Sequence, residues 1–240
     1  AAAVENMAPQ VSEVRKVLKR RAKYFSATVV ERDINFGLAK SIVDGVSSLC
    51  DEYGSIVVVE DDLEVSSDFL TFMSAALEQY SSEEEVMQIA GHTIAPPHNL
   101  ESRAFFLPIT TTWGWGTWRR AWQNFSWTPS GWPERKEDAE WSKLFTVNGA
   151  ADYMSMLEDR LKGENDSWGI LWWYAVSIKK GKVLYPATNL VLNFGFDGSG
   201  VHCGSTDLYN SQIQNKMQGD FAGNDFPSKI SVRPLDFFLL

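Results

Sequence analysis

The chain has 240 residues, of which 44% are hydrophobic, and a formal net charge of −9 at pH 7. This length and hydrophobic content suffice for one substantial domain with its own core. The negative charge argues against a nucleic-acid surface and against a polybasic membrane patch. Cys50 and Cys203 show neither metal-binding spacing nor a disulfide framework, so we expect free thiols, with one disulfide as the alternative.

No apolar stretch approaches the ~20 residues that span a bilayer, and no signal peptide opens the sequence. We therefore expect a cytoplasmic protein without a membrane span, with peripheral association at the inner face of the membrane as an alternative.

The sequence before residue 60 predicts two helices and two strands. Residues 11–18 and residues 38–49 each place apolar side chains on one helical face. Residues 27–30 form a short run that predicts a strand. Together with a strand at residues 56–59 it makes a strand–helix–strand unit, for which we expect parallel pairing and a right-handed crossover.

The most informative stretch is residues 55–65, Ser-Ile-Val-Val-Val-Glu-Asp-Asp-Leu-Glu-Val. Its unbroken apolar run predicts a strand covered on both faces, as in a parallel sheet, where ligands gather at the carboxyl ends of strands. Glu60, Asp61 and Asp62 repel one another there, which favours a hard divalent cation beside them. The alternative is that these acids are solvated turn formers, with Glu60 paired to a basic neighbour.

The longer string at residues 57–73 resembles the metal-binding segment of inverting glycosyltransferases of the GT-A fold. It is most similar to N-acetylglucosaminyltransferase I and is also similar to bacterial family 2 glycosyltransferases. The resemblance implies an α/β, Rossmann-like mixed sheet flanked by helices. It also implies that Asp62 ligates Mn²⁺ or Mg²⁺ on the diphosphate of a nucleotide-sugar, while Glu60 and Asp61 orient the ribose or donor sugar and the ligand shell.

In that family, two strands precede the first helix, and neither is visible in this sequence. We therefore expect a single domain over residues 1–240 that lacks the first strands, as an N-terminal truncation or an incomplete nucleotide site. The Asn35-x-Gly37 segment resembles the family segment ahead of the acidic motif, which implies donor contacts by Arg32, Asn35 and Lys40. The plain alternative is a helix packed on the sheet.

Further elements follow from periodicity and capping residues. His92 and His98 are expected to be ordinary packed or solvated side chains. We expect a helix capped by Ser67 or Asp68, strands at residues 86–90, 104–108 and 182–186, and helices around residues 119–125, 153–161 and 169–176.

Residues 110–118, Thr-Thr-Thr-Trp-Gly-Trp-Gly-Thr-Trp, combine large aromatic faces with glycines that permit close backbone approach. One interpretation is a tryptophan-packed helix start. The alternative, supported by the resemblance, is a platform for the acceptor or donor sugar in which Trp113 and Trp115 shape the pocket. Both interpretations can be true together if one tryptophan faces outward and the others are buried.

Asp166 precedes an apolar helix, and its simplest role is to cap that helix. An aspartate before a tryptophan in this position resembles the catalytic-base segment of the same transferases. Inversion requires one carboxylate to take the proton of the acceptor hydroxyl, so the resemblance implies this role for Asp166. Within the glycine-rich residues 195–204, the resemblance makes His202 a further metal or diphosphate ligand; the alternative is a surface histidine.

The sequence thus predicts inverting glycosyl transfer from a nucleotide-sugar to the hydroxyl of a sugar, glycolipid or polysaccharide, as in surface-polysaccharide biosynthesis. Two alternatives from other classes remain open. One is a metal-dependent phosphoryl-transfer or hydrolytic enzyme, which would release nucleotide without an acceptor. The other is a non-catalytic carbohydrate-binding or scaffold domain, whose sugar binding would depend neither on metal nor on Asp62.

Overall fold

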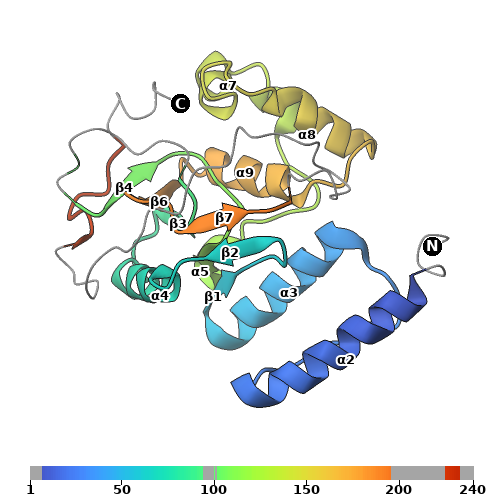
Figure 1. Cartoon of the computed structure of the whole chain (residues 1–240). Coiled ribbons are helices and arrows are strands. Elements are labelled where there is room, and N and C mark those ends of the chain that lie inside the picture. The colour runs from blue at the N-terminus through green and yellow to red at the C-terminus, as the bar shows by residue number, and fades with distance from the viewer. Residues whose placement is uncertain (1–6, 94–99, 101, 196–224, 233–240) are drawn as a thin grey trace. The chain divides into compact units, whose positions relative to one another are not determined.

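A computed structural model describes residues 7–93, 100, 102–195 and 225–232 of the chain (Figure 1). The described residues form a mixed α/β protein with eight helices, a five-stranded mixed sheet and a separate two-stranded antiparallel pair. The chain divides into two compact units, residues 1–41 and 42–240. Helix α3 (Gly37–Tyr53) begins in the first unit and continues into the second.

The first unit contains helix α2 (Ala8–Phe25), which confirms the helix predicted from residues 11–18. The predicted strand at residues 27–30 is wrong, because this segment pairs with no strand of the described chain. The segment after α2 is held by side chains of α2 and not by strand pairing. The Arg15 guanidinium donates a hydrogen bond to the Arg32 carbonyl at 2.7 Å, and the Lys19 ammonium lies 2.6 Å from the Glu31 carboxylate.

The second unit is built on a sheet with the strand order β1-β5-β3-β6-β4. Only the β3–β6 pair is parallel; the other three pairs are antiparallel. The predicted strands at residues 86–90, 104–108 and 182–186 are confirmed as β3, β4 and β6. The strand bounds are β1 Ser55–Val58, β3 Val86–Ala90, β4 Ala104–Leu107, β5 Trp115–Trp118 and β6 Lys182–Pro186.

The acidic motif follows a strand, as predicted, but the parallel environment expected for that strand is wrong. Strand β1 pairs antiparallel with β5, its one neighbour among the described residues, and its four side chains are half-buried. This pairing could not be predicted because β5 was not recognised as a strand. Its sequence is Trp-Gly-Thr-Trp, in which a glycine interrupts the pattern of a strand. Trp115, in one interpretation part of a helix start, therefore lies in a buried strand inside the sheet.

Helices cover the two faces of the sheet, and β5 contacts both layers because successive side chains of a strand point to opposite faces. Trp115 stacks on Trp168 of α9 (Trp168–Ile178), with ring centroids 5.4 Å apart. Trp118 points the other way and donates its indole N–H to the Leu77 carbonyl of α4 (Phe69–Gln79) at 3.0 Å. Asp68 holds the predicted N-cap position of α4, without a side-chain capping hydrogen bond.

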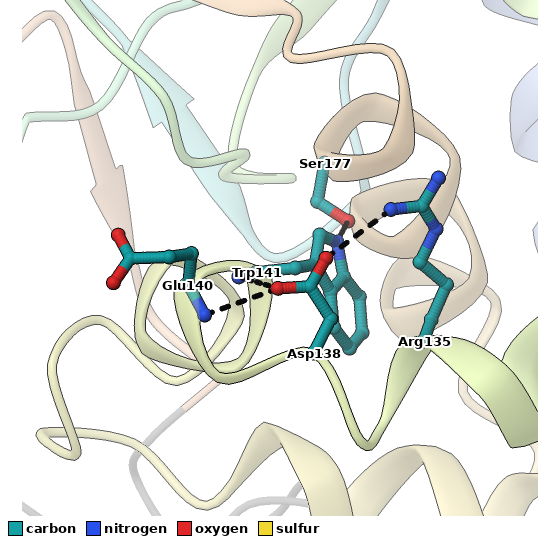
Figure 2. Close-up of polar contacts among 5 residues, drawn as sticks. All are labelled: Arg135, Asp138, Glu140, Trp141 and Ser177. Carbon is teal, nitrogen blue, oxygen red and sulfur yellow. Dashed lines mark hydrogen bonds and ion pairs between the residues drawn. The ribbon is translucent and has the colours of Figure 1, made fainter.

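Helices α7 (Ala139–Phe145) and α8 (Tyr153–Lys162) both contact α9. Figure 2 shows the polar contacts that fix α7: the Asp138 carboxylate accepts from the backbone N–H of Trp141, and the Trp141 indole donates to the Ser177 hydroxyl at 3.1 Å. Asp138 is thus the N-cap of α7. The remaining helices are short: α5 is Arg119–Trp122 and α6 is Trp132–Arg135.

A second pair of strands lies apart from the main sheet. Strand β2 (Leu63–Val65) pairs antiparallel with β7 (Val191–Asn193), joining the chain just after the acidic motif to the chain after β6. The Phe194 N–H donates to the Asp62 carbonyl at 2.9 Å and extends this pairing to the motif itself. The acidic turn is therefore anchored on both sides, by β1 before it and by β7 beside it.

Candidate functional site

The strand directions gather three chain segments at one edge of the sheet. Strands β1 and β3 are both antiparallel to β5, and β6 is parallel to β3, so β1, β3 and β6 run in the same direction. Their carboxyl ends lead into the acidic motif, into residues 91–93 and into residues 187–190. Ligands of open α/β sheets bind at such carboxyl ends. This edge is therefore the candidate site.

The acidic turn consists of Glu60, Asp61 and Asp62. Glu60 is half-buried, whereas the two aspartates are exposed. Burial, together with the negative charges of Asp62 and Asp61, raises the pKa of Glu60 to about 7. The ionised form of Glu60 is thus disfavoured by burial and by its two acidic neighbours, and a nearby cation would favour it.

The carboxylate of Asp62 faces the backbone of Gly195. A Cβ atom at position 195 would overlap the Asp62 carboxylate, so only glycine fits there without displacing it. Gly195 opens the glycine-rich segment discussed above. The rest of that segment, including His202 and Cys203, lies outside the described residues. Cys50 is buried with a free thiol.

The acidic turn offers hard oxygen ligands, which suit Mn²⁺ or Mg²⁺, and a cation there would relieve the repulsion that raises the pKa of Glu60. Within the described residues, no three histidine, cysteine or acidic side chains converge to form a metal site by themselves. A Mg²⁺-type site built from one or two carboxylates plus substrate phosphates does not need such a cluster. The residues present fit that type of site.

A cavity of about 320 Å³ opens near this edge, and we call it the α8–α9 cavity. It is lined by His92, by residues 110–113, and by parts of α8 and the first turns of α9. His92 leaves β3, and residues 110–113 lead into β5. Tyr153 and Met156 come from α8. Ser167 precedes α9, and Gly169, Ile170 and Trp173 belong to it.

His92 is only 3% exposed and lies edge-on to Trp113, with ring centroids 4.5 Å apart. Its Nδ1 lies 3.4 Å from the Val191 carbonyl oxygen. Because a carbonyl only accepts, this contact places the imidazole proton on Nδ1. Burial lowers the pKa of His92, so the ring is held neutral.

The two tryptophans predicted to shape a sugar pocket occupy different environments. Trp113 lines the α8–α9 cavity. Trp115 is fully buried and stacks on Trp168. In this structure it therefore packs in the core and offers no face to a ligand.

Asp166 is exposed and directly precedes Ser167 at the start of α9. The predicted capping role of Asp166 is wrong: Ser167 is the N-cap, and its hydroxyl accepts from the Ile170 N–H at 3.3 Å. Because Ser167 lines the α8–α9 cavity, Asp166 is one residue from its wall.

Arg32 and Asn35 belong to the first unit. The Arg32 guanidinium lies over the Phe36 ring, 4.3 Å from its centroid. The Asn35 side-chain oxygen accepts from the Gly37 N–H at 2.8 Å, so Asn35 forms the turn that begins α3.

His92 and Tyr153 line the cavity but were not predicted from the sequence as residues of the site. For His92 a signal was present, because it lies two residues beyond the predicted strand 86–90, where ligands of α/β sheets gather. For Tyr153 there was none, because its place depends on how α8 packs beside α9.

Comparison with known proteins adds no assignment: no protein-family model matches the chain, and no curated protein matches its sequence. Of the helices in the described residues, none is long and apolar enough to cross a membrane.

Proposed function

We propose that the chain catalyses glycosyl transfer, with inversion, from a nucleotide-sugar to a sugar hydroxyl. One observation carries the proposal: the acidic turn and the α8–α9 cavity, with Asp166 beside the cavity wall, are held near the same edge of one sheet. A transferase needs such a pair of sites, one for the donor diphosphate and one for the group that attacks the donor. The resemblance of residues 57–73 to GT-A transferases supports the same conclusion.

In this proposal, the acidic turn holds the donor. Asp62 ligates the cation that accompanies the diphosphate, and Glu60 and Asp61 orient the ribose or donor sugar and the ligand shell. A bound Mn²⁺ or Mg²⁺ supplies Lewis-acid stabilisation of the diphosphate leaving group. Because Gly195 has no side chain, the backbone on the β7 side can lie against the Asp62 carboxylate.

Asp166 is proposed to accept the proton of the acceptor hydroxyl as that oxygen attacks the anomeric carbon. The C–O bond to the acceptor forms while the bond to the diphosphate breaks, so the configuration inverts in one step without a covalent enzyme intermediate. The exposed position of Asp166 leaves its carboxylate accessible to an incoming hydroxyl.

Calorimetric titration of UDP and of GDP, each with and without Mn²⁺, tests the donor site. We expect micromolar, metal-dependent binding of one nucleotide, and loss of that binding in Asp62→Asn. Asp166→Asn serves as the matched control, because it should bind the nucleotide nearly unchanged but lose turnover. Nucleotide binding that survives in Asp62→Asn, or binding of neither nucleotide, would contradict the proposed donor site.

A further inference from the structure

We propose that the α8–α9 cavity binds one uncharged sugar ring of the acceptor and discriminates against sugars that carry a carboxylate. The inference rests on the proposed function for the identity of the ligand, but its selectivity follows from the cavity alone. The selectivity is independent of the acidic motif, because the residues of that motif do not line the cavity.

The size and lining of the cavity suit a single ring. Its volume of about 320 Å³ lies at the lower end of ligand sites, which span about 300–1,000 Å³. The threonine hydroxyls of residues 110–112 can each donate and accept, as sugar hydroxyls do. Trp113, Met156 and Ile170 supply the apolar surface against which the C–H face of a pyranose packs.

The described residues of the cavity wall carry no charged side chain. His92, the one titratable group there that could become a cation near neutral pH, is kept neutral by burial, which lowers its pKa. A carboxylate entering this cavity would therefore lose its hydration without gaining a cationic partner, which is unfavourable.

One feature of the wall favours an anion, because the first turn of α9 faces the cavity and helix N-termini carry a partial positive charge. That charge is only about half an elementary charge. The N–H of Ile170, in the first turn of α9, is already bonded to the Ser167 hydroxyl. The turn therefore offers a carboxylate one donor fewer and no full positive charge, and the net preference is for an uncharged ring.

Matched pairs of methyl glycosides test this selectivity directly. Methyl glucoside and methyl glucuronide differ only in the carboxylate, as do the corresponding galactose and mannose pairs. Ligand-observed NMR titrations into the full chain give the dissociation constant of each. We expect at least one neutral glycoside to bind about ten-fold or more tightly than its uronate partner. Equal or tighter binding of the uronates, or binding of no member of any pair, would overturn the proposal.

A charge placed in the wall should remove the discrimination. Met156→Lys introduces an ammonium from α8 at nearly the same side-chain length, and Met156 is already 38% exposed, so the fold should tolerate the change. We expect this variant to bind the uronate within about three-fold of its neutral partner. Leu161→Lys is the control, because Leu161 is 41% exposed on the same helix but does not line the cavity.

An equal shift in both variants would trace the discrimination to the overall charge of the protein, and would overturn the assignment to this cavity. The test is also separable from that of the proposed function. Nucleotide binding at Asp62 can fail while the neutral glycosides still bind selectively. Conversely, metal-dependent nucleotide binding without any preference among the glycosides would leave the transferase in place and overturn the cavity assignment.

Discussion

At the scale of single residues, Glu60 has the most unusual chemistry in the described chain for a carboxylate. Its pKa is raised to about 7, from an ordinary 4.5, first by burial and then by the charges of Asp62 and Asp61. Between these two pH values the folded protein holds a proton that the unfolded chain has released. The free energy of unfolding therefore falls as pH rises through this window.

Glu60→Gln should remove that penalty. In metal-free buffer containing EDTA, we expect the variant to be more stable than the wild type at pH 8 by about 1–3 kcal/mol, since one pKa unit is worth about 1.4 kcal/mol and partial exposure screens the effect. Near pH 4 the difference should vanish. Urea denaturation at both pH values measures it, with the exposed Glu64→Gln as control. Equal stabilities of wild type and Glu60→Gln at pH 8 would contradict the raised pKa of Glu60.

The residues near Asp166 show that the position of a helix can be predicted from sequence more readily than the residue that caps it. The start of α9 was located correctly, but both Asp166 and Ser167 are good N-caps, and the backbone places the serine hydroxyl on the Ile170 N–H. Neighbouring capping residues have similar propensities, so which of them caps depends on the direction from which the chain enters the helix.

At the scale of elements, the site depends on the junction where the chain leaves β3, enters β5 and approaches the start of β7. The Gly91 N–H donates to the Gly114 carbonyl at 2.7 Å, and the Leu190 N–H donates to the Gly91 carbonyl at 3.0 Å. These bonds hold His92 and Trp113, the next residues outward, against each other in the cavity wall. The junction thus determines the shape of the site.

Gly91→Ala should damage this junction. An added Cβ would lie 2.7 Å from the Gly114 carbonyl oxygen and 2.9 Å from a methyl group of Val191, closer than real side chains approach. We expect a loss of about 1–3 kcal/mol in the free energy of unfolding, measured by urea denaturation. Gly45→Ala is the control: an added Cβ there would meet nothing within 4 Å beyond the neighbouring backbone of α3, and the change should stabilise by about 0.5–1 kcal/mol. A Gly91→Ala variant as stable as the wild type would refute the close packing described here.

Strand β5 shows why the sheet could be predicted only in part. The strands at residues 86–90, 104–108 and 182–186 are continuous apolar runs and were found from sequence. The four residues of β5 are equally buried, but Gly116 packs closely on the neighbouring strand: a Cβ there would lie 3.0 Å from the Ile56 carbonyl oxygen. The reason for a glycine at this position lies in a strand 60 residues earlier in the sequence, so the residues around Gly116 do not themselves indicate a strand.

At the scale of the whole molecule, strand direction brings the candidate site together. Residues 60–62, 91–93 and 110–113 are distant in sequence, yet they flank the same edge of the sheet because β1 and β3 run parallel to each other with β5 antiparallel between them. The sequence analysis placed the acidic motif at a strand end correctly, but assumed a parallel neighbour at residues 27–30. The pairing partner of a strand is a property of the entire sheet, which local patterns do not encode.

The central claim is that the chain displaces a nucleoside diphosphate from the anomeric carbon with inversion. Slow hydrolysis of a donor, in which water replaces the acceptor, tests it without knowledge of the natural acceptor. The measurement is time-resolved ¹H NMR of α-linked UDP- and GDP-sugars incubated with the chain and Mg²⁺. We predict that the first product is the free sugar in the β configuration together with UDP or GDP, and that Asp62→Asn abolishes its formation. A sugar 1-phosphate with UMP or GMP would contradict the account, because those products require attack at phosphorus, as in a phosphoryl-transfer or hydrolytic enzyme.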